Sequence, residues 1–380
     1  MLTSQPLPLS LYIHFPWCVK KCPYCDFNSF EQVADNVEGI YIEALIADLT
    51  DEKQRLTAPV SLHSIFMGGG TPSLFSTTAI ATILETINSL FPISLNTEIT
   101  LEANPGTTDQ KKFNGYYRAG VNRISIGVQS FGDVFLEKLG RVHSANDSKN
   151  AYFAAREAGF TNINLDLMHG LPGQTLTEAI NDLKTAVLLG SEHLSWYQLT
   201  IEPNTYFHKY PPVLPDEDQL WDIYEQGLDY LTSEGFTRYE ISAFSRQDRQ
   251  CRHNLNYWSF GDYLGIGAGA HGKITTPGNP FSISRTTKTR SPTDYLKMAN
   301  RKQVIVETDS IVLEFMMNTL RTKAGFTETQ FEQRTGIKFA AIEDFVQNGI
   351  DKKLLQSTTL GIAPTDFGLR YLDELLMLVD

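Results

Sequence analysis

The sequence predicts an α/β protein built as an incomplete (βα)6 TIM-type barrel, followed by a smaller winged-helix-like α+β unit. In the first two hundred residues, six apolar strand-like segments alternate with amphipathic segments, which favours a parallel sheet whose strands are joined by helices. Residues 305–380 instead show three helix-like segments and then a hairpin pattern. The alternation alone fits a doubly wound sheet as well as a barrel.

The barrel strands are predicted from short segments rich in β-branched, aliphatic and aromatic residues. They are expected at 11–15, 62–67, 97–101, 123–128, 163–168 and 193–199. The helices between them are expected at 36–57, 77–90, 107–119, 146–158 and 175–189. Gly120, Gly159 and Gly190 follow three of these helices, where a glycine commonly ends a helix.

Three units are expected along the chain. Residues 1–235 form the partial barrel, residues 236–304 a connecting segment, and residues 305–380 the C-terminal unit. The proline-rich, acidic stretch 210–218 is interpreted as a linker or turn. Outside the barrel we expect helices at 217–233, 310–320, 327–335, 340–348 and 364–378, a strand at 238–243 and a hairpin at 354–363.

Charge and composition restrict the function. The chain has 380 residues, a formal net charge of −12 and 42% hydrophobic residues, enough for a full core. An acidic balance argues against nucleic-acid binding, and residues 305–380 carry seven Lys/Arg against twelve Asp/Glu, so this unit is expected to pack on the barrel or contact a protein. No signal peptide or spanning segment is expected. We expect a cytoplasmic protein and leave a peripheral membrane contact and a homodimer open.

The first strand leads into a loop with three of the four cysteines, Cys18, Cys22 and Cys25, spaced as CxxxCxxC. Three thiolates on one loop can hold three corners of a cubic iron–sulfur cluster, which four cysteines normally bind, so one iron would stay open. A disulfide is disfavoured by the odd number. A closed zinc site needs a fourth ligand, and the loop has no histidine at zinc spacing. His14, inside the strand, is interpreted as a packed or supporting histidine.

The loop, with Tyr24 just before its last cysteine, resembles that of the radical S-adenosylmethionine (SAM) superfamily. This resemblance implies a 4Fe-4S cluster whose open iron binds SAM exchangeably, and an electron donor that reduces the cluster so that SAM is cleaved to a 5′-deoxyadenosyl radical. The segment YIHFPWCVKKCPYCDFNS is similar to the branch that contains oxygen-independent coproporphyrinogen III oxidase and its heme-chaperone relatives. The oxidase continues as CxxxCxxCxC, whereas Phe27 stands at the last position here, as in the chaperones.

Further candidate residues follow the predicted strands, where barrels of this kind place their chemistry. The segment GGGTP at 68–72 follows the second strand, and its backbone can approach a ligand closely and offer N–H groups. Taken alone, each of these residues is more simply explained as part of a turn or as a solvated side chain. The prediction of a ligand site rests on their occurrence, in order, at the ends of the predicted strands. By resemblance, the SAM-contacting positions are Tyr12, Tyr24, Gly69, Gly70, Thr71, Glu102, Gln129, Arg141 and Asp166. The resemblance leaves the number of bound SAM molecules open.

The segment HNxxYW, formed by His253, Asn254, Tyr257 and Trp258, suits a flat apolar ligand. Imidazole can bind heme iron while aromatic rings cover the macrocycle, and the resembled chaperones associate this element with heme. The alternative is a buried histidine–tyrosine hydrogen bond in a packed loop. Cys251, beside it, is interpreted as a buried thiol without a ligand role.

Two main functions remain. The first is a heme chaperone that keeps the cluster and SAM and delivers heme to apo-proteins such as respiratory enzymes. The second is an oxygen-independent coproporphyrinogen III oxidase, which forms protoporphyrinogen IX by a radical mechanism. Phe27 in place of the fourth cysteine weighs against that dehydrogenase activity. A radical SAM enzyme acting on another substrate is a third hypothesis.

Overall fold

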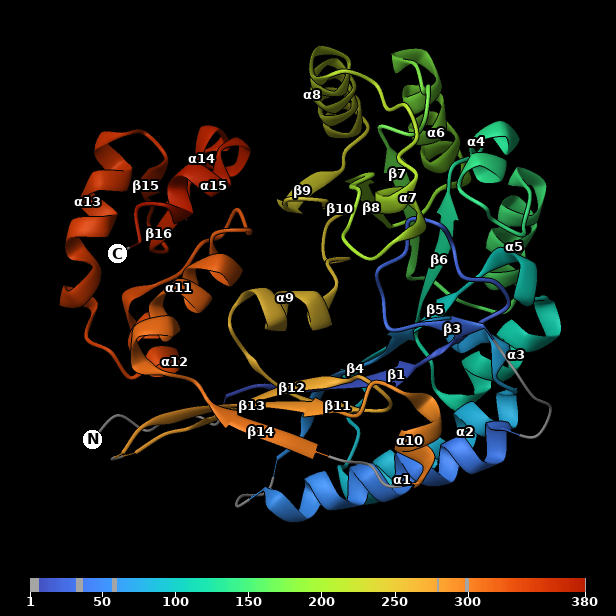
Figure 1. Ribbon diagram of the computed structural model, residues 1–380, viewed down its shortest axis with the longest axis horizontal. Coiled ribbons are helices and arrows are strands. Elements are labelled where there is room, and N and C mark those ends of the chain that lie inside the picture. Colours follow the sequence, from blue (N-terminus) through green and yellow to red (C-terminus); the bar gives the residue numbers. More distant parts are fainter. Residues whose placement is uncertain (1–6, 32–36, 57–59, 279, 298–300, 380) are drawn as a thin grey trace.

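One curved sheet forms the centre of the molecule (Figure 1). The computed structural model describes residues 7–31, 37–56, 60–278, 280–297 and 301–379. The strand order in the sheet is β14-β13-β12-β11-β1-β4-β5-β6-β7-β8-β10-β9. Six consecutive parallel strands form its middle, β1 (Leu9–Phe15), β4 (Leu62–Gly69), β5 (Glu98–Ala103), β6 (Arg123–Gln129), β7 (Ile163–His169) and β8 (His193–Gln198).

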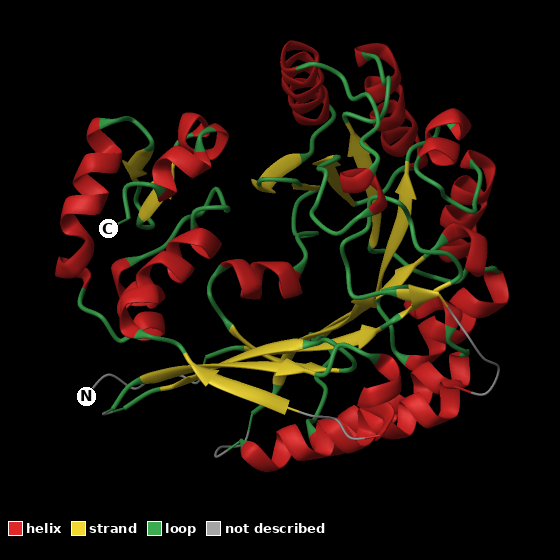
Figure 2. Cartoon of the chain, viewed as in Figure 1, coloured by secondary structure: helices red, strands yellow, loops and turns green. Residues whose placement is uncertain are grey.

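These six strands form the predicted incomplete barrel. Their order across the sheet is the same as their order along the chain, and the helices cover the outer, convex face (Figure 2). A doubly wound sheet would reverse its strand order partway and carry helices on both faces. The outer helices are α1 (Val37–Arg55), α2 (Thr77–Leu90), α3 (Gln110–Ala119), α5 (Ala145–Glu157) and α6 (Leu176–Leu189). Residues 36 and 57, the ends of the first predicted helix, lie outside the described residues.

Local signals explain where these helices begin and end. The side chains of Ser144 and Thr175 cap α5 and α6 in capping boxes, which satisfy the first free N–H groups. Gly120 and Gly190 follow α3 and α6 in the left-handed region, as predicted. The helix expected from residue 107 begins at Gln110, because the Asp109 side chain accepts a hydrogen bond from Lys112 N and caps it there.

Residues 236–304, expected to connect the two units, also build both edges of the sheet. β11 (Asp262–Ile266) pairs parallel with β1, and an antiparallel extension of three strands, the edge extension, follows it. At the other edge β10 pairs with β8, and β9 pairs with β10. The remaining edge strands are β9 (Thr237–Glu240), β10 (Ala243–Ser245), β12 (His271–Thr276), β13 (Ser282–Lys288) and β14 (Arg301–Ile305). The HNxxYW segment forms a short helix, α9 (Arg252–Trp258), on the inner side of the sheet (Figure 1).

The other elements are short apart from α8. They are β2 (Trp17–Cys18), β3 (Phe30–Glu31), η1 (Pro72–Leu74), η2 (Pro105–Thr107), α4 (Asp133–Lys138), α7 (Tyr206–Lys209), α8 (Glu217–Ser233) and α10 (Pro292–Lys297). Among the described helices none is long and apolar enough to cross a bilayer.

The C-terminal unit has the predicted order of helices followed by a hairpin. It comprises α11 (Thr308–Thr319), α12 (Glu328–Thr335), η3 (Phe339–Ile342), α13 (Glu343–Asp351), the β15 (Leu355–Ser357)–β16 (Ile362–Pro364) hairpin, α14 (Asp366–Arg370) and α15 (Leu372–Leu376). The rings of Phe326 and Phe331 pack edge-on against Phe315, each with centroids 5.2 Å away. The single helix expected at 364–378 is divided, because Tyr371 leaves helical geometry.

A buried ion cluster fastens the edge extension to α1. Lys288 of β13, with 1% of its side chain exposed, contacts the carboxylates of Asp48 and Glu52. Tyr295 donates a hydrogen bond to Asp48 at 2.7 Å, and Arg301 contacts Glu52 at 2.8 Å. Buried charges of this kind are stable only while they remain paired.

We expect Lys288→Met to destabilise the fold strongly. The substitution removes the positive charge that neutralises the buried carboxylates of Asp48 and Glu52. We expect the free energy of unfolding to fall by about 3 kcal/mol. Urea unfolding measures the loss. Lys297→Met is the matched control, because Lys297 pairs with Asp294 on the surface, where an ion pair contributes less than about 1 kcal/mol. Equal effects of the two variants would contradict the stabilising role of the buried ion cluster.

Candidate functional site

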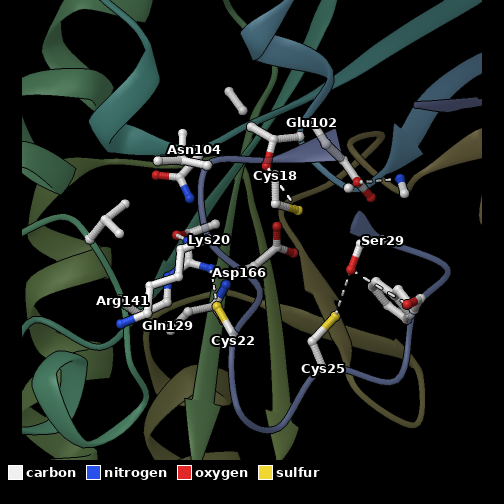
Figure 3. A pocket seen from close by; sticks show the side chains of 18 of the residues that line it. Cys18, Lys20, Cys22, Cys25, Ser29, Glu102, Asn104, Gln129, Arg141 and Asp166 are labelled. Atoms are coloured by element: carbon white, nitrogen blue, oxygen red, sulfur yellow. Dashed lines mark hydrogen bonds between the residues drawn. The ribbon is translucent and has the colours of Figure 1, made fainter. Parts of the chain in front are cut away.

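A cavity of about 330 Å³ opens at the carboxyl ends of the barrel strands, beside the cysteine loop (Figure 3). It gathers most of the predicted residues from segments far apart in the sequence. The predicted residues that line it are Cys18, Cys22, Tyr24, Cys25, Gly69, Gly70, Thr71, Glu102, Gln129, Arg141 and Asp166. Tyr12 and His253 are not among the lining residues that the structure describes.

Each cysteine of the loop has its own polar neighbour. Thr71 Oγ1 lies 3.5 Å from the Cys18 sulfur, and Arg141 Nη1 lies 3.6 Å from the Cys22 sulfur. Ser29 Oγ lies 3.8 Å from the Cys25 sulfur, and all three thiols are free. Donors placed at the sulfurs stabilise thiolates, the form that binds metal.

The three thiols surround a cavity rather than a point. Within the described residues, no three His, Cys, Asp or Glu side chains are arranged around a position for one metal ion. Burial raises the pKa of the Cys18 and Cys25 thiols, which disfavours bare thiolates, whereas a coordinating metal removes that proton. Thiols spread around a roomy cavity fit the separate corners of an iron–sulfur cluster.

The loop is anchored by a chain of hydrogen bonds that begins at the predicted residue Tyr12. The Tyr12 hydroxyl lies 3.0 Å from His14 Nδ1, and His14 Nε2 lies 2.8 Å from the Asn28 carbonyl oxygen. Because a carbonyl only accepts, Nε2 donates and Nδ1 accepts from Tyr12. Asn28 Nδ2 then donates to the carbonyls of Ala268 and Arg290 at 2.9 Å. His14 is therefore a supporting histidine, one of the roles expected from the sequence.

The glycines of GGGTP permit close packing against the chain that leads to the cysteines. Gly69 has a φ of +111°, and a Cβ on Gly70 would lie 2.6 Å from the Trp17 carbonyl oxygen. The N–H groups are already used: Gly69 N donates to Glu102, Gly70 N to the end of β1, and Thr71 N to Trp17. The N–H groups of Gly69, Gly70 and Thr71, which the sequence suggested for a ligand, are thus engaged within the protein.

Two carboxyl groups give the cavity a preference for cations. Burial, and then the nearby charge of Asp166, raises the pKa of Glu102 to about 8. Burial also raises the pKa of Asp166, although Ser125 and Asn164 donate to its oxygens at 2.8 and 2.7 Å. A positively charged ligand would restore the ionised forms by Coulomb attraction. The ammonium and sulfonium of SAM are such charges.

The fourth strand ends in a bulge that directs Gln129 into the site. Gln129 has a φ of 68°, unusual for a residue with a side chain, and the pairing with β7 shifts between Gly127 and Gln129. Tyr197 donates to Gln129 Oε1 at 2.8 Å, and Arg141 Nη2 donates to Gly127 O at 2.9 Å. The buried Arg141 Nε has no hydrogen-bond partner within the described residues, so it could serve an anionic group such as a carboxylate.

Sequence reasoning missed several lining residues. Lys20, Asn104, Ser195 and Tyr197 also face the cavity. Tyr197 lies near the end of β8, as Gln129 lies at the end of β6, so strand-end position was an available signal. Asn28 carried no such signal, because its partners belong to a distant loop.

His253 lies away from this cavity. Only 8% of its surface is exposed, and its Nδ1 lies 3.0 Å from the hydroxyl of Ser64, near the start of β4. Ser64 donates to Ser10, so His253 Nδ1 donates to Ser64. Its ring packs on Phe66 at 5.0 Å, and burial lowers its pKa to about 3. The environment matches a packed histidine, with serine rather than tyrosine as partner; Cys251 beside it is also buried.

Comparison with known proteins identifies relatives along almost the whole chain. Residues 12–186 match the model of the Radical SAM superfamily. The heme chaperone HemW of Haemophilus influenzae is 48% identical over 379 residues, which cover 98% of this chain and 97% of that protein. The heme chaperone HemW of Escherichia coli is 47% identical and covers 98% of both chains.

The solved structure of coproporphyrinogen III oxidase (HemN) from Escherichia coli has the same fold. It aligns with a TM-score of 0.81 and covers 98% of this chain and 90% of that one, at 22% identity. At 22% identity, this match shows that the two proteins share a fold and supports the fold alone.

We expect Glu102→Gln to change how stability depends on pH. The folded protein keeps a proton on Glu102 up to about pH 8, whereas the unfolded chain releases it near pH 4.3. Stability therefore falls as pH rises between these values, by up to about 1.4 kcal/mol per pH unit. Glutamine keeps the acceptor for Gly69 N and removes this titration.

Urea unfolding of the ligand-free protein at pH 6 and 8 measures the effect. The parent should lose more stability than Glu102→Gln between the two pH values. Glu137→Gln, on the neighbouring helix α4, is the control and should follow the parent. Identical pH profiles of the parent and Glu102→Gln would contradict the buried, protonated carboxyl.

Proposed function

The chain belongs to the HemW family of radical SAM proteins, and we propose that it is a heme chaperone. It holds a 4Fe-4S cluster on Cys18, Cys22 and Cys25, binds SAM at the open iron, and binds heme for delivery to apo-proteins such as respiratory enzymes. The observation that carries this proposal is the 47–48% identity to two heme chaperones over nearly the full length.

The cavity supports the cluster and SAM part of the proposal. The three thiols hold three corners, and their donors Thr71, Ser29 and Arg141 stabilise the thiolates. When bound and reduced, such a cluster supplies the electron for reductive cleavage of SAM. Glu102 and Asp166 attract the positive charges of SAM, and the free Arg141 Nε suits its carboxylate. Gly69, Gly70 and Gln129 shape the same space.

The oxidase is the second candidate, favoured by the shared fold. Phe27 argues against it. Its side chain is 60% exposed at the cavity, and it stands where the oxidase has its fourth cysteine. An apolar ring cannot replace a thiol or thiolate as ligand or proton donor. We therefore infer that the chain lacks coproporphyrinogen dehydrogenase activity.

Partners follow from this function. Heme, a heme-receiving apo-protein and an electron donor are required, and a cytoplasmic location would keep the thiols reduced. Val19 and Val142 join Phe27 as exposed apolar side chains at the cavity mouth, and patches of this kind commonly contact other proteins. A homodimer and a peripheral membrane contact stay as predictions from the sequence, and no nucleic-acid partner is proposed.

Single alanine variants test the cluster. Cys18→Ala, Cys22→Ala and Cys25→Ala should each lose the visible absorption and bound iron after anaerobic reconstitution, because each removes one of three corners. Cys251→Ala is the matched control, since Cys251 lies outside the loop, and it should retain both. Intact clusters in all three loop variants would refute the assignment.

A paired assay tests the function itself. The reconstituted protein, with SAM and a reductant, receives heme in one anaerobic sample and coproporphyrinogen III in another. We expect tight, stoichiometric heme binding, seen as a Soret shift, and no protoporphyrinogen. Conversion of coproporphyrinogen without heme binding would favour the oxidase.

A further inference from the structure

A row of buried hydrogen bonds lies behind the cysteine cavity and ends at Asp166. Asp166 of β7 lines the cavity (Figure 3), and its two carboxylate oxygens accept from Asn164 at 2.7 Å and from Ser125 at 2.8 Å. Asn164 lies two residues earlier on the same face of β7, with 2% of its surface exposed. It is not among the described residues that line the cavity, so it acts on a ligand there only through Asp166.

The orientation of the Asn164 amide decides what Asp166 receives. The oxygen and the nitrogen of a carboxamide are nearly equal in size, so packing alone does not choose between the two orientations. In this structure Nδ2 faces Asp166, and Oδ1 lies 2.6 Å from His193 Nδ1 and 3.2 Å from the Ser195 hydroxyl. A hydroxyl can donate or accept, so Ser195 fits either orientation. His193 fits one of them, because a ring nitrogen that carries a proton only donates.

Tyr239 fixes the ring nitrogen of His193 that carries this proton. Burial, and then the nearby charge of Arg123, lowers the pKa of His193 well below its usual value, so the ring holds a single proton near pH 7. The Tyr239 hydroxyl lies 2.8 Å from His193 Nε2, and its oxygen accepts from Cys251 N at 3.2 Å. Among the described residues, Nε2 is the only acceptor within reach of the Tyr239 proton. Nε2 therefore accepts, and the proton of the ring is on Nδ1.

Every donor in the row thus points toward the cavity. The direction runs from the backbone of Cys251, the residue before α9, through Tyr239, His193 and Asn164 to Asp166. The first four residues are buried, and a buried polar group without a partner is costly. One bond of the row cannot be reversed at low cost unless the others are reversed with it.

We propose that His193 is a positioning residue for SAM, which holds the Asn164 amide as a donor to Asp166 and so keeps this carboxylate ready for a positive charge. This inference rests on the proposed function, in which Asp166 attracts a charge of SAM. If the amide were reversed, its oxygen would face the carboxylate. Such a neighbour favours the protonated acid, which attracts a cation less strongly.

Two substitutions of His193 separate this role from packing. The amide nitrogen of asparagine occupies the place of Nδ1, whereas that of glutamine extends to the place of Nε2. His193→Gln fills more of the space but loses the donor to Asn164, and we expect it to weaken SAM binding by about tenfold or more, as for a lost hydrogen bond to a charged group. His193→Asn leaves a larger void but keeps the donor, and its affinity should stay close to that of the parent.

Anaerobic calorimetry of the reconstituted full chain measures SAM affinity, while iron content and thermal unfolding verify each variant. His169→Gln is the matched control. His169 is a second buried histidine, which packs on Trp196 outside the row, and its variant should bind SAM as the parent does. A folded His193→Gln with the affinity of the parent would overturn the proposal. Weaker binding by His193→Asn than by His193→Gln would also overturn it, because that order indicates packing.

A measurement without SAM tests the row itself. The nitrogen NMR spectrum of the ligand-free protein, labelled at histidine, shows which ring nitrogen carries the proton, and the signals of His193 are those absent from His193→Asn. We expect the Nδ1–H tautomer at neutral pH, and the Nε2–H tautomer would overturn the proposal. If the parent holds its cluster and binds no SAM, the proposed function fails in its SAM part. The role of His193 then fails with it, whichever tautomer is found.

Discussion

The fixed position of the cysteine loop is the constraint on which the rest of the structure depends. Three thiols on a loop can bind a cluster only if the loop keeps one shape, and few of its own residues are in regular structure. Asn28 supplies the restraint, because its amide joins Ala268 and Arg290 while its carbonyl accepts from His14. The edge extension is therefore part of the cluster site, and the buried Lys288 ion cluster secures that extension to α1.

The barrel interior separates two ends with different chemistry. The carboxyl end holds thiols, carboxylates and Arg141, whereas α9 packs against β4 near the amino end. A hydrogen-bonded row connects them. Cys251 N donates to Tyr239, whose hydroxyl lies 2.8 Å from His193 Nε2. His193 Nδ1 lies 2.6 Å from Asn164, which donates to Asp166 in the cavity.

Much of the fold and of the first site could be predicted from the sequence, because both depend on local patterns. The alternation of short apolar segments with amphipathic segments indicated the six strands, and capping residues and glycines indicated the helix ends. The CxxxCxxC spacing and the strand-end residues Glu102, Gln129 and Asp166 lie together in one cavity, as expected for barrel strand ends. The comparisons support the heme chaperones as the family to which the motifs point.

The features that sequence reasoning missed depend on distant partners. The strands β12 to β14 are rich in polar residues, and they become strands by pairing in series with β11, which itself pairs with β1. The orientation of His253 is decided by Ser64, almost two hundred residues earlier, so the motif alone could not show that its ring is buried.

The most direct test of the two-ended arrangement is a heme titration at increasing SAM concentrations, with the reconstituted cluster in place. If the two sites are separate, heme still binds when SAM is saturating. Any change in the apparent Kd of heme then reaches a constant value at high SAM concentration, as expected for two coupled sites. If heme and SAM share the cysteine cavity, the apparent Kd of heme rises in proportion to the SAM concentration. That proportional rise would contradict a heme site that is separate from the cluster cavity.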